Sequence, residues 1–148
     1  MSHDISNRSN EKLIKYWESL KKGRSFPSES QIDPDAIADI WDSCFLVSID
    51  DVTRRLGYRY SYLGTDLIEA YGDDISNPDV AARLVSSTNY STAHKFDDVR
   101  QSKTPVIDES EFVNLRNVHI RYRTCMLPLG FNDKEVAHII GCMSWRVY

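Results

Sequence analysis

The feature that most constrains the fold is the stretch Arg55–Gly72. Tyrosines alternate with other residues at positions 58, 60 and 62, and Gly64 and Thr65 follow one residue later. Alternation with period two predicts a β-strand, and Thr65 can cap a short helix that Gly72 ends. A strand that runs directly into a short helix, with further strands later in the chain, predicts a domain built around one sheet.

Length and composition set the class of protein. The chain has 148 residues, 41% hydrophobic and 27% charged, which is typical of one globular domain. The formal net charge of −4 and the isoelectric point near 5.5 argue against nucleic-acid binding, since a phosphate backbone requires a clustered positive surface.

The N-terminus, Met1-Ser-His-Asp4, has neither a basic region nor an apolar core, so no signal peptide is expected. No apolar run approaches the roughly 18 residues that a membrane span requires. The three cysteines, Cys44, Cys125 and Cys142, lie far apart in hydrophobic segments. They are expected to be free thiols in a reducing cytosol, and a cytoplasmic location without membrane attachment is predicted.

The hydrophobic pattern predicts several helices. Residues 1–10 are expected to be a polar, disordered N-terminus, and residues 11–148 a single domain. Apolar residues at helical spacing follow Asn10 and end at Gly23. Further helical segments are predicted over 36–41 after an Asp33–Pro34 start, and over 66–70, 78–84 and 90–101.

Five strands are predicted, and no repeat or linker divides them. Cys44–Ile49 and Leu56–Leu63 form a hairpin, and the last three strands follow the helices: Pro105–Leu115, Val118–Leu129 and Val136–Arg146.

This order of elements resembles that of PAS domains, and several short motifs carry the likeness. They are Trp17, Arg24-x-x-Pro27, Ile32-Asp-Pro-x-x-Ile37, Cys44-Phe-Leu-Val47, Tyr58-Arg-Tyr60, Leu63-Gly-Thr65, Tyr71-Gly72 and Met126-Leu-Pro-Leu129. Together they resemble the single-domain PAS family of alphaproteobacteria, formerly a domain of unknown function. The resemblance covers about residues 16–145. It implies an α+β fold: a five-stranded antiparallel sheet with helices on one face, preceded by an N-terminal helix.

Aromatic and polar residues on the strands provide the candidate ligand site. Tyr58, Tyr60 and Tyr62 are expected to share one face of their strand, because strand side chains alternate. In the same way, Tyr122, Thr124 and Met126 are expected to share one face of the fourth strand, and Met143 and Trp145 one face of the last. If these faces point inward, hydroxyls reach an apolar space suited to a small organic ligand. A packed core with hydroxyls at its rim is the alternative. The candidate ligand-binding residues are Tyr60, Tyr62, His94, Tyr122, Thr124, Met126 and Trp145.

The sequence does not support a cofactor or a metal. His94 lies on a predicted helix where haem-binding PAS domains carry their axial histidine, but the surrounding residues are polar. His and Cys residues lack the paired spacing that holds zinc. The segment 65–72 contains no cysteine, which excludes flavin photochemistry of the light-sensing PAS kind.

The N-terminal helix has two interpretations. Its apolar residues Leu13, Ile14, Trp17 and Leu20 either dock on the domain's own sheet or form a homodimer interface, and the homodimer is favoured.

The expected function is that of a stand-alone sensory or regulatory module without catalytic activity. A small-molecule ligand, a second copy of the chain and an unidentified signalling protein are the expected partners. One alternative is an enzyme that uses the same cavity, for which Tyr60, Tyr122, His119 and Asp108 are the candidates. The other is an interaction domain with a closed core.

Overall fold

The computed structural model of the chain describes residues 7–52, 55–88 and 92–148. Within these ranges it describes all side chains except those of residues 51–52, 55–56, 84–88 and 92–94.

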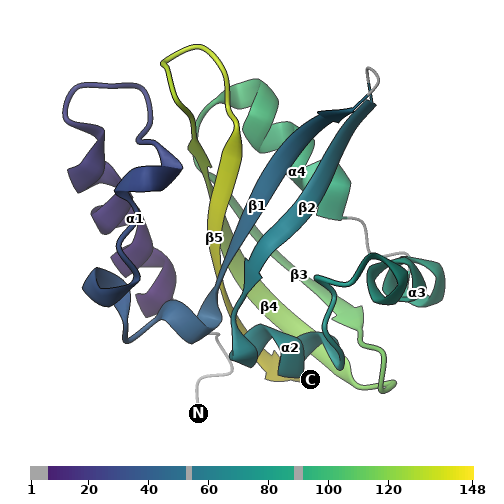
Figure 1. The fold of residues 1–148 in the computed structure, drawn as a ribbon. Coiled ribbons are helices and arrows are strands. Elements are labelled where there is room, and N and C mark those ends of the chain that lie inside the picture. Colours follow the sequence, from purple (N-terminus) through teal and green to yellow (C-terminus); the bar gives the residue numbers. More distant parts are fainter. Residues whose placement is uncertain (1–6, 53–54, 89–91) are drawn as a thin grey trace.

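A five-stranded sheet forms the centre of the molecule, as predicted (Figure 1). Its strands lie in the order β2 (Arg55–Leu63), β1 (Cys44–Val52), β5 (His138–Val147), β4 (His119–Leu129) and β3 (Val106–Val113). Every neighbouring pair is antiparallel. The central strand β5 is the last in the sequence, and it joins the β1–β2 hairpin to the β3–β4 hairpin.

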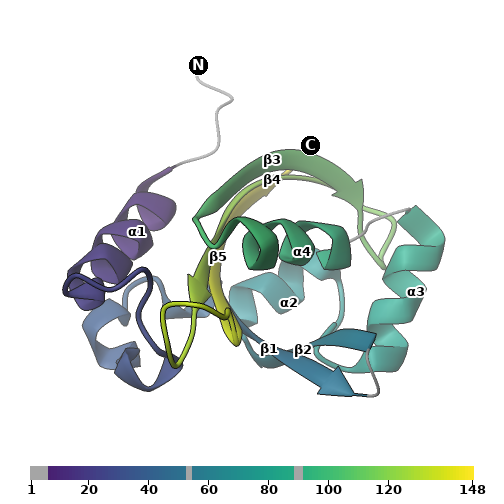
Figure 2. The same ribbon diagram turned by 90° about the horizontal axis from the view of Figure 1, so that it is seen from above.

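Helices cover both faces of the sheet. Figure 2 shows the sheet curving around α2 (Thr65–Tyr71) and α4 (Thr92–Ser102), with α3 (Pro78–Thr88) beside them. The helix α1 (Arg8–Lys21) lies on the opposite, outer face (Figure 2). Three short 3₁₀ helices connect α1 to β1: η1 (Glu29–Gln31), η2 (Pro34–Ile37) and η3 (Trp41–Ser43).

A β-bulge in β2 changes the direction of its tyrosines. Val47 of β1 pairs with Tyr60, whereas the preceding Leu46 pairs with Tyr62, so Ser61 is an additional residue in β2. Because side chains alternate along a strand and a bulge shifts that alternation by one residue, Tyr60 lies on the inner face and Tyr62 on the outer face. The prediction that Tyr58, Tyr60 and Tyr62 share one face is therefore wrong for Tyr62.

The N-terminal helix docks on its own sheet. Leu13 and Trp17 are buried, and the indole Nε1 of Trp17 donates a hydrogen bond of 2.8 Å to the backbone carbonyl of Pro128 in β4. Ile14 and Leu20 are half-buried. Leu13 and Trp17 are thus not available as the predicted dimer interface, because the chain's own outer face already covers them.

Two local predictions also need correction. α1 begins at Arg8 and Asn10 is buried, so the helix includes residues 8–10 of the segment predicted to be disordered; residues 1–6 lie outside the described ranges. The helix predicted over 36–41 consists of 3₁₀ turns, because the bonds Ala36 to Asp33 and Ile40 to Ile37 span three residues rather than four.

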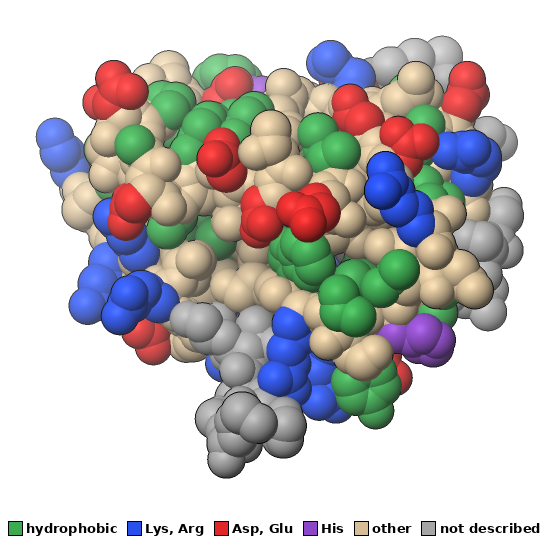
Figure 3. Space-filling model, turned by 90° about the horizontal axis from the view of Figure 1, so that it is seen from below, with side chains coloured by type: hydrophobic (Ala, Val, Ile, Leu, Met, Phe, Trp, Pro, Cys, Tyr) green, Lys and Arg blue, Asp and Glu red, His purple; other side chains and the backbone are tan. Residues whose placement is uncertain are grey.

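Figure 3 shows the end of the molecule at which α2 and the C-terminus lie. Acidic, basic and hydrophobic side chains are interspersed there, and the basic ones form no continuous stripe (Figure 3). This part of the surface therefore lacks the electrostatic pattern that is typical of nucleic-acid binding.

Candidate ligand cavity beneath helix α4

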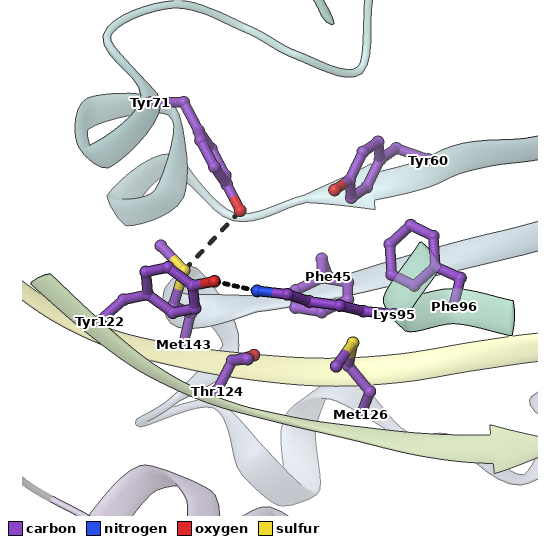
Figure 4. A pocket seen from close by; sticks show the side chains of 9 residues that line it. All are labelled: Phe45, Tyr60, Tyr71, Lys95, Phe96, Tyr122, Thr124, Met126 and Met143. Carbon is purple, nitrogen blue, oxygen red and sulfur yellow. Dashed lines mark hydrogen bonds between the residues drawn. The ribbon is translucent and has the colours of Figure 1, made fainter. Parts of the chain in front are cut away.

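A small cavity lies between α4 and the inner face of the sheet (Figure 4). Its volume is about 10 Å³, which is room for about one water molecule. Mainly aromatic and sulfur-containing side chains surround it, together with tyrosine hydroxyls and one ammonium group. The side chains are Phe45, Tyr60, Tyr71, Lys95, Phe96, Tyr122, Thr124, Met126 and Met143. We call this space the α4 cavity.

A glycine in β5 allows Phe45 to enter the cavity. Phe45 pairs with Gly141 across the β1–β5 ladder, and a Cβ atom at Gly141 would lie 2.1 Å from the phenyl ring. The ring therefore lies directly over the backbone of β5. There it contacts Tyr60 edge-on, with ring centroids 6.0 Å apart.

The end of α2 positions Tyr71. Gly72 ends the helix in the left-handed conformation with φ of 86°, and the β3–β4 turn holds the last carbonyls. Asn114 Nδ2 donates to the carbonyl of Ala70 and the Leu115 amide donates to that of Tyr71. The Tyr71 hydroxyl, fixed in this way, donates to Met143 Sδ at 3.7 Å inside the cavity (Figure 4).

A cluster of charged and polar groups lies at the rim of the cavity. Lys95 reaches from α4 across the cavity toward Tyr122 of β4 (Figure 4), and its Nζ hydrogen-bonds the Tyr122 hydroxyl. The same Nζ lies 2.5 Å from Asp108 Oδ2 of β3, and the Tyr122 hydroxyl donates to that oxygen at 3.0 Å. Charge-assisted hydrogen bonds of this kind are stronger than neutral ones, so the Lys95–Tyr122–Asp108 cluster connects α4 to β3 and β4.

A second polar contact attaches α4 to the other half of the sheet. The Tyr58 hydroxyl of β2 hydrogen-bonds Asp97 of α4. Burial, followed by this hydrogen bond to a carboxylate, raises the pKa of Tyr58 above its ordinary value. Phe96, between Lys95 and Asp97, packs against Tyr58 with ring centroids 5.2 Å apart. Helix α4 is thus attached to both hairpins, with an aromatic contact in between.

Comparison with known families identifies the fold. The family model for the PAS domain matches residues 5–144. The chain belongs to the PAS domain family. The crystal structure of a Rhodobacter sphaeroides LOV protein superimposes with a TM-score of 0.50 at 9% sequence identity, covering 78% of this chain and 68% of that chain. At that identity the likeness concerns the fold alone. A search among curated proteins finds no match.

The predicted ligand residues of this PAS domain fall into three groups. Tyr60, Tyr122, Thr124 and Met126 lie at the α4 cavity. Tyr62 and Trp145 lie elsewhere, and the structure does not describe the side chain of His94.

Tyr62 and Trp145 have structural partners away from the cavity. Tyr62 stacks on Trp41 with ring centroids 4.3 Å apart, and its hydroxyl donates to the Trp41 carbonyl. Trp145 pairs with Tyr122 in the β4–β5 ladder, but its Nε1 donates to Asp66 Oδ2 in the first turn of α2 at 3.1 Å. The bulge at Ser61 explains the position of Tyr62, and the start of α2 covers Trp145.

Sequence reasoning missed four of the lining residues: Phe45, Tyr71, Lys95 and Phe96. The sequence could have indicated Phe45, because Phe45 and Val47 occupy alternate positions of their strand and are therefore expected to share one apolar face. The polar composition of the α4 segment argues against haem binding at this helix and gives no sign of the cavity beneath it. However, Lys95 and Asp97 point toward Tyr122 and Tyr58 of the sheet and do not form a solvated face.

All three cysteines of the chain lie away from the cavity. Cys142 pairs with Cys44 on one side and with Cys125 on the other, so the three thiols form a row across the outer face. All are buried and free. A hydrogen bond to Cys142 and burial raise the pKa of Cys44, and burial raises that of Cys125. Cys44 and Cys125 therefore remain protonated, and all three side chains belong to the outer core.

Two further observations concern the described part of the chain. No helix there has the length and apolar character needed to cross a membrane. The described side chains also contain no group of three His, Cys, Asp or Glu residues arranged to hold a metal ion.

The described lining residues of the cavity contain no histidine. Asp108 contacts Lys95 and Tyr122, while His119 is exposed at the start of β4. A carboxylate–histidine pair, which general acid–base catalysis often uses, is not present among these residues.

Proposed function

We propose that this PAS domain is a sensory module that receives a chemical signal in the α4 cavity and has no catalytic role. The observation that carries the proposal is the convergence of three tyrosines, Thr124 and one lysine on a small space whose other lining side chains are apolar. A few polar groups in an apolar lining are typical of sites that bind small molecules.

Helix α4 would transmit the signal. Tyr58 attaches it to β2, and the Lys95–Tyr122–Asp108 cluster attaches it to β3 and β4. A ligand that alters either contact changes the relative stability of two positions of α4, and a ligand shifts such an equilibrium only by its difference in affinity for the two. The coupling is expected to be in the usual range of about 1–3 kcal/mol.

Native mass spectrometry of the purified protein tests this proposal. We expect a bound small molecule that is released on denaturation and is identified in the denatured extract. A Phe45→Trp variant, which fills the cavity, should be folded and should lose that molecule. A bound molecule that Phe45→Trp retains in full would place the ligand elsewhere and contradict the proposal.

The small volume of the cavity supports a second candidate function, an interaction domain with a closed core. A space of about 10 Å³ accepts a larger ligand only if α4 moves. If wild-type protein is empty, and a panel of metabolites leaves its melting temperature unchanged, the domain acts through a protein partner on its surface.

Location and association remain part of the proposal. The presence of three unpaired, buried thiols supports a reducing compartment such as the cytoplasm. A homodimer would have to use a surface other than Leu13 and Trp17, and sedimentation velocity at several protein concentrations tests whether one forms.

A further inference from the structure

We propose that the α4 cavity binds a short monocarboxylate, whose carboxylate replaces that of Asp108 on Lys95 and Tyr122. This inference rests on the proposed sensory function and names the chemical class of the ligand.

The donors of the cluster already hold a carboxylate. Asp108 Oδ2 accepts from Lys95 Nζ at 2.5 Å and from the Tyr122 hydroxyl at 3.0 Å. Both donors also line the α4 cavity, whereas Asp108 does not. The chain's own side chain therefore shows the geometry that a ligand carboxylate would adopt, and the ligand would reach the same donors from the cavity side.

Asp108 can leave this position at modest cost. It lies on β3, the edge strand of the sheet, and its side chain is 28% exposed, compared with 25% for Lys95. Because the carboxylate is already partly open to solvent, hydration offsets part of the cost of breaking its contacts. After rotation toward solvent the Asp108 carboxylate is hydrated, while the ligand carboxylate retains the contacts to Lys95 and Tyr122.

The remaining lining limits the size and charge of the ligand. The volume of about 10 Å³ accommodates a group of about one water or one methyl. The side chains beyond Lys95 and Tyr122 include Phe45, Met126 and Met143. A second carboxylate placed among them would be buried without a cationic partner, at high cost. An aliphatic tail of one carbon fills this volume, and a tail of two carbons requires a small outward shift of α4. A dicarboxylate is excluded, because its second charge would be buried without a partner.

The exchange would also link binding to the fold. Asp108 is the β3 member of the cluster, so its release breaks the contact between Lys95 of α4 and Asp108 of β3. Lys95 and Tyr122 remain joined through the ligand. The bound state therefore differs from the free state at the edge of the sheet, where a partner can detect the change.

Titration with propionate, followed by NMR and by isothermal calorimetry, tests the inference. Propionamide is the matched neutral ligand. The variants are Asp108→Asn, which removes the internal carboxylate, and Lys95→Met, which removes the ammonium group. Glu109→Gln is the control, because Glu109 neighbours Asp108 on β3 but pairs with Arg123 at 3.0 Å on the other face. Circular dichroism establishes that each variant is folded.

We expect wild-type protein and Glu109→Gln to bind propionate equally, and Asp108→Asn to bind it roughly tenfold more tightly, since a charge-assisted hydrogen bond no longer competes. Lys95→Met should lose binding, and propionamide should bind to none of the four proteins. Tyr122→Phe, a milder change than Lys95→Met, should weaken binding without unfolding the domain.

The inference is wrong if folded Asp108→Asn binds propionate no better than wild type, or if Lys95→Met binds it equally well. It is also wrong if propionamide binds as tightly as propionate. Native mass spectrometry separates this failure from that of the proposed function: a different bound molecule in the α4 cavity would keep the sensory function and exclude the carboxylate.

Discussion

At the scale of single residues, the shape of the cavity depends on the contact between Phe45 and Gly141. The phenyl ring occupies the space in which any other residue at position 141 would have its Cβ atom. Protein interiors are close-packed and adjust poorly to added atoms. The smallest possible side chain at Gly141 is therefore expected to displace Phe45 into the cavity or away from β5.

We predict that Gly141→Ala destabilises the domain by about 1–3 kcal/mol, the usual cost of overpacking a core. Urea denaturation measures the change. Gly57→Ala is the matched control, because its Cβ would lie 3.8 Å from the nearest atom, the carbonyl oxygen of Asp50. Combining Gly141→Ala with Phe45→Leu should recover part of the loss; no recovery would show that the ring is not the cause.

Single residues also show where sequence reasoning reaches its limit. Alternation predicted an inward Tyr60, which lies at the cavity. The same alternation predicted an inward Tyr62, because the bulge at Ser61 leaves no mark in the pattern of polar and apolar residues. Lys95 was overlooked for a related reason: a lysine on a polar helix is usually solvated, and only the tertiary structure places Tyr122 and Asp108 within its reach.

At the scale of elements, α1 is part of the core. Trp17 is 2% exposed and hydrogen-bonded to β4, so α1 covers the outer face as α2 and α4 cover the inner one. The amphipathic pattern predicted the helix correctly. The pattern does not show whether the helix packs on the chain's own sheet or on a second chain, since either surface could bury the same stripe of apolar residues.

We predict that Trp17→Ala lowers the free energy of unfolding by about 3–5 kcal/mol, the range for loss of a large buried side chain. It should not alter the sedimentation coefficient of the folded protein. Ile14→Ala, at a half-buried position of the same helix, should cost less. A dimer that dissociates in Trp17→Ala, with little loss of stability, would restore α1 as the interface.

At the scale of the whole molecule, hydrophobic alternation and turn residues predict the five strands along the chain, and the resemblance to PAS domains implies the antiparallel sheet that they form. The volume of the cavity cannot be predicted from the sequence. It is a small difference between two large quantities, the space that the sheet and helices enclose and the volume that their side chains fill. Tyrosines serve a packed core and a ligand pocket equally well. The partners of each hydroxyl depend on contacts between residues far apart in the sequence, such as Tyr58 and Asp97.

The packing of the whole molecule also protects its thiols. Cys44, Cys125 and Cys142 are fully buried, so a reagent in solution cannot reach their sulfur atoms in the folded protein. We predict that Ellman's reagent labels none of the three thiols rapidly in native protein and all three in denaturant. A native thiol that reacts at the rate of the denatured protein would indicate that α1 detaches from the sheet.

The central position of β5 has a consequence for synthesis on the ribosome. The two hairpins come from separate parts of the chain, and β5, the strand that joins them, is translated after both. Until it emerges, β1 and β4 each present an unpaired edge, and such edges are prone to aggregate. The core of the nascent domain therefore cannot form before β5 has been synthesised. The two hairpins become a single folded unit only when this strand pairs with both.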